Sequence, residues 1–134
     1  MHPHLMDLDG VARTLAVSNV TARRWASDGR IPGVRIGGQW RFWAPAVLTR
    51  AVGPEAAGHV PALPPGHTDP TIVGTAQLAE LLGIHEQTVT VLLRKGAIPA
   101  TKVGHQWRAY WPNIRDRIAA GLPLIDPTEP EAPS

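Results

Sequence analysis

Near its N-terminus the chain reads Gly29-Arg30-Ile31-Pro32-Gly33-Val34-Arg35-Ile36-Gly37-Gly38-Gln39-Trp40-Arg41-Phe42, and the same pattern returns 67 residues later in Gly96-Ala97-Ile98-Pro99 and Gly104-His105-Gln106-Trp107-Arg108. Twelve gapless identities, a tryptophan among them, relate residues 12–50 to residues 79–117. Chance does not produce so dense a match. The sequence therefore predicts a tandem duplication of a unit of about 45 residues.

Proline and glycine mark the boundaries between the units. We expect unit 1 at residues 5–52, a Pro/Gly-rich linker at 53–71, unit 2 at 72–121 and an acidic, Pro-rich tail at 122–134. The linker contains five prolines and three glycines, which predicts a semi-extended segment without a helix or a central strand. Leu122, Leu124 and Ile125 are candidates to dock on unit 2.

Each unit is predicted to start with two short helices joined by a tight turn. In unit 1, Asp7 is the expected N-cap of the first helix, and Ser18 is the expected N-cap of the second, which ends at Gly29. In unit 2 the two helices start near Thr75 and end at Gly96. Two helices at this spacing are typical of a helix-turn-helix. Prolines 45 and 112 predict the start of a third helix in each unit.

The segment after the second helix is predicted to form a β-hairpin, or wing. A three-residue loop at 37–39 would pair Ile36 with Trp40, Arg35 with Arg41 and Val34 with Phe42, giving one apolar and one basic face. In unit 2 the same register pairs Val103 with Trp107 and Lys102 with Arg108. The predicted fold is mainly α with small β-hairpin wings: two tandem winged helix-turn-helix domains. The expected core aromatic residues are Trp25, Trp40, Phe42, Trp107 and Trp111.

The residues from Val11 to Phe42 resemble the excisionase-family helix-turn-helix, which is related to the DNA-binding domains of MerR-like regulators. Unit 2 keeps the wing but has Thr90-Val91 where unit 1 has Arg23-Arg24. The resemblance implies a small DNA-binding protein. Its role would be either that of an excisionase, a recombination directionality factor, or that of a transcriptional regulator.

Charge is distributed unevenly along the chain. The net charge is +2, but residues 7–50 carry +4, residues 72–120 carry +3, and the remainder holds five acidic residues without Lys or Arg. Two basic blocks are the electrostatic pattern expected of a protein that contacts phosphate. Double-stranded DNA is therefore the expected partner.

We expect the second helix of each unit to lie in the major groove and each wing to contact the backbone or minor groove. Arginine can bind guanine, and asparagine can bind adenine, through two hydrogen bonds. In unit 1 the candidate residues are Ser18, Asn19, Thr21, Arg23, Arg24, Ser27, Arg35, Gln39 and Arg41. In unit 2 they are Gln87, Thr90, Arg94, Lys102, Gln106 and Arg108.

The sequence leaves a second interpretation of unit 2 open. Its second helix presents Glu86, Gln87, Thr90 and Val91, a poor surface for phosphate and a plausible one for protein. Unit 2 would then bind an integrase or recombinase, RNA polymerase or another copy of the chain. In the first interpretation the linker, with a span of roughly 25 Å, lets one chain occupy two half-sites about 34–36 Å apart, in direct or inverted orientation. The oligomeric state is left open.

Other classes of protein are disfavoured. The chain has no cysteine, and its six histidines follow no metal-ligand spacing, so neither a metal site nor a cofactor is expected. We find no nucleophile elbow, phosphate loop or acid pair, and we expect no enzyme activity. The absence of a long apolar run or a signal peptide predicts a cytosolic protein without a membrane partner.

Overall fold

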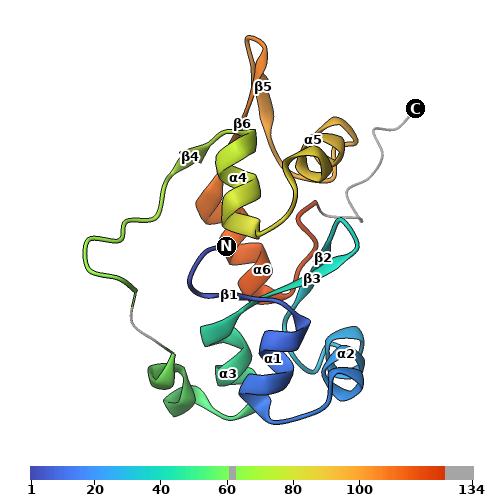
Figure 1. Cartoon of the computed structure of the whole chain (residues 1–134), viewed down its shortest axis with the longest axis vertical. Helices are drawn as coiled ribbons and strands as arrows, with labels where there is room; N and C mark the ends of the chain where they lie inside the picture. The colour runs from blue at the N-terminus through green and yellow to red at the C-terminus, as the bar shows by residue number, and fades with distance from the viewer. Residues whose placement is uncertain (61–62, 126–134) are drawn as a thin grey trace.

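The computed structural model describes residues 1–60 and 63–125 (Figure 1). Linker positions 61–62 and the predicted tail from residue 126 lie outside the described residues. Within them, the chain forms two copies of a helical unit, each with a small three-stranded antiparallel sheet. The predicted class, mainly α with β-hairpin wings, is confirmed.

Unit 1 has the order predicted from its capping residues. It contains β1 (Leu5–Met6), α1 (Leu8–Leu15), α2 (Asn19–Ser27), β2 (Val34–Ile36), β3 (Gln39–Trp43) and α3 (Ala44–Ala51). Asp7 accepts a hydrogen bond from the Gly10 N–H at 2.8 Å, and Ser18 Oγ accepts one from the Thr21 N–H at 3.1 Å. These caps fix the starts of α1 and α2. Gly29, with φ of 77°, supplies the left-handed residue just beyond α2.

Unit 2 repeats this order. It contains β4 (Ile72–Val73), α4 (Thr75–Leu82), α5 (Glu86–Arg94), β5 (Thr101–Val103), β6 (Gln106–Tyr110) and α6 (Trp111–Ala120). The linker departs from the prediction, because a short 3-10 helix, η1 (Pro54–His59), forms at its start. Proline is compatible with a first helical turn, where its missing N–H is not needed. Leu124 is buried, as expected of a docked residue, whereas Leu122 and Ile125 remain exposed.

The predicted register of both hairpins is wrong. Val34 pairs with Arg41, Arg35 with Trp40, and Ile36 with Gln39, around a two-residue turn. The turn residues Gly37 and Gly38 both have positive φ, 61° and 82°. This is the backbone of a type I′ turn, whose twist matches that of the strands. The hairpin of unit 2 has the equivalent register, with Val103 opposite Gln106.

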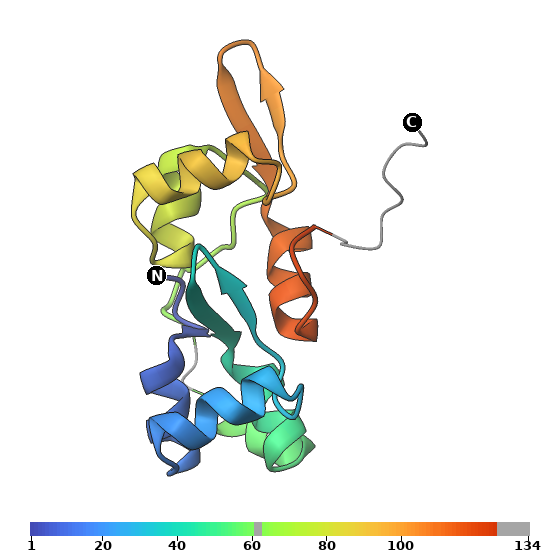
Figure 2. The same ribbon diagram turned by 90° about the vertical axis from the view of Figure 1, so that its right-hand side faces the viewer.

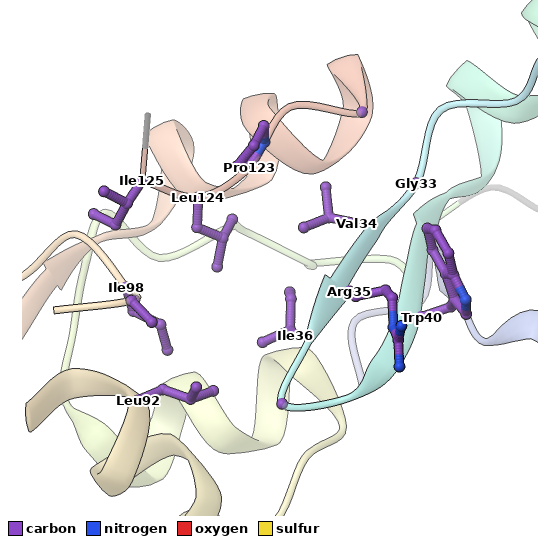
Figure 3. Close-up of a pocket in the computed structure, with 13 residues that line it drawn as sticks. Gly33, Val34, Arg35, Ile36, Trp40, Leu92, Ile98, Pro123, Leu124 and Ile125 are labelled. Carbon is purple, nitrogen blue, oxygen red and sulfur yellow. The ribbon is translucent and has the colours of Figure 1, made fainter. Parts of the chain in front are cut away.

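The β2–β3 hairpin, which we call wing 1, is covered on both faces. Trp40 and Phe42 on one face pack with the core of unit 1. Val34 and Ile36 on the other face belong to the core of unit 2. Figure 3 shows these two side chains opposite Ile98 and Leu124 across an apolar pocket. The two units therefore pack against each other through wing 1 and are not independent domains on a flexible linker.

The N-terminal segment adds a second contact between the units. The imidazole of His2 is buried between Trp43 and Trp111, with ring centroids 4.9 and 5.9 Å away. The backbone N–H of His2 donates to the carbonyl oxygen of Leu81 at 2.9 Å. Residues 1–4 are thus an ordered part of the interface between unit 1 and unit 2.

Candidate nucleic-acid interface

The outer face of α2 is basic and exposed. Asn19, Arg23, Arg24 and Ser27 are all exposed. Within residues 1–60 and 63–125, neither Arg23 nor Arg24 lies in an ion pair. The buried face of the same helix carries Ala22 and Ala26. The two guanidinium groups are therefore available to an anionic partner.

Two of the predicted site residues in unit 1 also have a structural role at the start of α2. Ser18 Oγ donates to Thr21 Oγ1 at 3.0 Å and accepts from the Thr21 N–H. This capping arrangement orders the first turn, from which Asn19 and Val20 project as exposed residues. Val20 is 67% exposed, which is unusual for an apolar side chain on a short helix and places an apolar group beside the basic residues.

The equivalent face of α5 is less basic. Gln87 and Arg94 are exposed, while the hydroxyl of Thr90 donates to the carbonyl oxygen of Glu86 at 3.1 Å. Val91 is 45% exposed. His85 caps the helix, its Nδ1 accepting from the Gln87 N–H. This face therefore presents one arginine where α2 presents two.

The two second helices lie on the same side of the molecule. Both appear on the right of Figure 1, and in Figure 2 they cross the face in the same direction, with wing 1 between them. The two second helices are thus related mainly by a shift along the long axis of the molecule. A ligand that meets both helices would meet them in the same orientation.

The hairpin of unit 2, which we call wing 2 (β5, β6 and their turn), projects from the body in both views (Figures 1 and 2). Lys102 and Gln106 are exposed, and the Lys102 ammonium lies 5.6 Å from the Trp107 ring centroid. Arg108 is half-buried: its Nη1 donates to the Trp107 carbonyl oxygen at 2.7 Å, and its Nη2 donates to Gln106 Oε1.

Arg41 does not lie on a basic wing face, contrary to the prediction. It is buried, with Nε donating to the Leu82 carbonyl oxygen at 2.6 Å and Nη2 donating to the Gly83 carbonyl oxygen at 2.7 Å. Burial lowers the pKa of the guanidinium, and Asp7 partly offsets this. Arg41 faces the C-terminal end of α4 because the two-residue turn puts it on the same face as Val34 and Ile36. Arg35 and Gln39 of wing 1 remain exposed.

A charged cluster joins the N-terminal segment, the linker and α6. The Nε2 atoms of His2 and His67 each lie 2.7 Å from Asp69 Oδ1, and Arg115 Nη1 lies 3.1 Å from Asp69 Oδ2. Burial raises the pKa of Asp69, but the hydrogen bonds from His67, His2 and Arg115 outweigh it and hold that pKa well below its usual range. The cluster pins the N-terminus and the linker to α6.

The two histidines and the aspartate are grouped closely enough to hold a metal ion, a grouping that the sequence spacing did not suggest. The tautomer of His2 opposes this. Its Nδ1 accepts a hydrogen bond from the His4 N–H at 3.0 Å, so Nε2 carries the proton and donates to Asp69. A neutral imidazole bound in this way has no lone pair at Nε2 for a metal. The geometry is that of a hydrogen-bonded charge cluster.

Comparison with protein families agrees with this geometry. A family model described as a helix-turn-helix domain matches residues 5–42 and 72–108. This helix-turn-helix is of the excisionase-like type. The chain belongs to this helix-turn-helix family. The two matches cover more than half of the chain and coincide with the two units. The family supports a DNA-binding protein with two tandem helix-turn-helix domains.

Searches among curated proteins and among solved structures return no match for the chain. Among the described residues, no helix has the length and apolar character needed to cross a membrane.

The docking of wing 1 is the feature that sequence reasoning missed, although two signals pointed to it. Consecutive glycines at 37 and 38 favour a two-residue turn. With that turn, Val34 and Ile36 face away from Trp40 and Phe42, so the hairpin has two apolar faces. An apolar face on each side indicates a hairpin covered on both sides.

Proposed function

We propose that this protein binds double-stranded DNA in a sequence-specific manner, with α2 in the major groove. The observation that carries this proposal is the exposed face of α2, where Arg23 and Arg24 form no ion pair with any residue of 1–60 or 63–125 and Asn19 stands one turn away. These are side-chain types that can bind base edges through two hydrogen bonds. Ser27 and the capping residues Ser18 and Thr21 are then in position to contact the flanking backbone.

We infer further that the DNA target is a direct repeat. The two second helices lie on one side and run in the same direction (Figure 2), and wing 1 packs between the units. In this arrangement Gln87, Thr90 and Arg94 of α5 meet a second half-site with weaker sequence discrimination. Lys102 and Gln106 of wing 2 contact the backbone beyond it, and Arg35 and Gln39 contact the backbone between the sites.

The sharpest test compares variants of the whole chain. Leu5, Val34 and Ile36 of unit 1 belong to the core of unit 2. An isolated unit would lose these contacts, so single units are unsuitable for this test. A DNA site selected from a random pool is titrated with the wild type, Arg23→Ala and Arg24→Ala, with circular dichroism as the folding control. Loss of site preference supports the proposal. Unchanged affinity and preference in both variants would exclude α2 as the reading element.

A second candidate function for unit 2 rests on α5. This helix exposes Glu86 and Val91 beside Gln87 and Thr90, a surface suited to a protein such as an integrase, a recombinase or RNA polymerase.

The biological role of the protein is either that of an excisionase-like directionality factor or that of a small transcriptional regulator. Gel mobility of circularly permuted DNA fragments measures DNA bending. This assay separates the two roles, because an architectural excisionase bends its DNA site. Thr90→Ala and Val91→Ala leave DNA affinity intact if α5 binds protein.

A further inference from the structure

The contact between the two units joins different surfaces of the duplicated fold. Unit 1 contributes its hairpin, and unit 2 contributes the end of α4 and one side of α5. Arg41 reaches the Leu82 and Gly83 carbonyl oxygens, and a Cβ placed on Gly37 would lie 2.7 Å from Thr88 Cγ2. We call the hairpin side of this contact the hairpin half and the helix-end side the helix half. Because the units are copies, unit 2 also has a hairpin half, and unit 1 also has a helix half.

Wing 2 is the unused copy of the hairpin half. Ile36 is 2% exposed in the contact, whereas its equivalent Val103 is 62% exposed. Arg108 repeats the two hydrogen bonds that Arg41 makes within its own hairpin, to the preceding tryptophan carbonyl and to the glutamine side chain. Arg41 also donates hydrogen bonds to two carbonyl oxygens at the end of α4, and among the described residues Arg108 makes no equivalent bonds.

The end of α1 is the unused copy of the helix half. Leu15 and Ala16 are equivalent to Leu82 and Gly83. Both helices end in a left-handed residue, with φ of 58° at Ala16 and 66° at Gly83, so both carbonyl ends have the same backbone geometry. Ala16 is the one non-glycine residue with positive φ among the described residues. Thr21, equivalent to Thr88, stands at the same place on α2.

The two unused halves lie at opposite ends of the long axis. Wing 2 forms one end of the molecule, and α1 ends near the other (Figure 1). Beside wing 2, a hollow is lined by Ile72, Gly74, Thr75, Glu86, Trp107 and Arg108. The negative end of a helix dipole is attracted to a guanidinium. The carbonyl end of α1 therefore offers Arg108 the same backbone dipole that α4 offers Arg41, and Arg13 in that last turn is paired with Asp9 at 3.4 Å.

We propose that a second copy of this chain docks head to tail, with its α1 end on wing 2 of the first. Arg108 of one copy donates to the Leu15 and Ala16 carbonyl oxygens of the next copy, and the wing 2 turn packs on Thr21. The contact repeats the one already present between the units. Because it joins different surfaces, it leaves a free wing 2 on the last copy and a free α1 on the first, and the assembly stays open-ended. This proposal does not depend on DNA binding.

Sedimentation velocity of the full chain without DNA tests the proposal over a concentration series. The wild type should sediment faster as its concentration rises, and Arg108→Ala should raise the dissociation constant at least tenfold, since it removes a charged partner from the contact. Arg50→Ala, which removes an exposed arginine from α3, is the matched control and should associate like the wild type. Circular dichroism checks that each variant folds.

A mixing experiment distinguishes this contact from a symmetric dimer. Thr21→Arg blocks the helix half and Arg108→Ala disables the hairpin half, so each variant alone stays monomeric. Mixed together, they retain one intact half each and should stop at a dimer. A wild type that stays monomeric at every concentration would overturn the proposal, as would an Arg108→Ala variant that associates like the wild type or a mixture that remains monomeric.

Discussion

The guanidinium of Arg41 binds the carbonyl oxygen of Leu82 at a distance of 2.6 Å, joining a hairpin of the first unit to the last turn of a helix in the second. The equivalent residue, Arg108, lies on a projecting hairpin. One arginine of the duplicated pair is therefore part of the interior, and the other is at the surface. This difference governs how the two should respond to mutation.

Arg41→Ala should lower the free energy of unfolding by roughly 2–4 kcal/mol, because it leaves the buried carbonyl oxygen of Leu82 without a charged donor. Arg108→Ala, measured at a concentration low enough to keep the chain monomeric, should change it by less than about 0.5 kcal/mol. Guanidinium denaturation followed by tryptophan fluorescence measures both. Equal losses in the two variants would contradict the assignment of Arg41 to the interface.

Arg23→Ala or Arg24→Ala should weaken binding to a selected DNA site by roughly 1–3 kcal/mol and relax the preference at one base pair. Thr90→Ala should cost clearly less, because a neutral hydroxyl makes a weaker hydrogen bond than a guanidinium. Fluorescence anisotropy at fixed salt provides the comparison. If the Thr90 change abolishes binding and the arginine changes do not, unit 2 reads the DNA and the assignment is reversed.

Arg35→Ala and Lys102→Ala should each reduce the slope of log affinity against log salt by about one unit, as expected when a single phosphate contact is lost. Neither change should alter which base sequence is preferred. The measurement is a set of DNA titrations across a range of salt concentrations. A wild-type slope near zero would exclude DNA as the main partner.

The spacing of the two half-sites should be rigid. A flexible linker would tolerate changes of spacing, but the units share a core through Val34 and Ile36. Inserting about 5 base pairs turns one half-site by about half a helical turn, so it should reduce affinity to that of a single half-site. Inverting one half-site should have the same effect. Footprints that cover both half-sites at every spacing would show that the units separate on DNA.

Acid should destabilise the protein through His2. Burial lowers the pKa of His2 below its ordinary value of 6.5, although Asp69 acts in the opposite direction. The unfolded chain therefore binds the proton at higher pH than the folded chain does, and the free energy of unfolding falls as the pH drops below 6.5. His2→Gln removes this titration, so its stability should vary less between about pH 7 and about pH 5. Denaturation at both pH values measures the difference.

Local features of the fold could be predicted from the sequence because they depend on near neighbours. The caps at Asp7 and Ser18 bind N–H groups three residues away, and Gly29 ends α2 through its own backbone conformation. The duplication is visible in the residues themselves, and with it the two-unit architecture. The outer face of α2 follows from helical periodicity, which puts Ala22 and Ala26 inside and Arg23 outside.

Only the tertiary structure decided what wing 1 and the N-terminus do. Arg41 donates hydrogen bonds to carbonyl oxygens 41 and 42 residues further along the chain, and His2 is hydrogen-bonded to Asp69, which is 67 residues away in sequence. A guanidinium or an imidazole has the same local preferences whether it faces water or another unit. Its burial depends on which surface packs against it, and that surface exists only once both units have folded and docked.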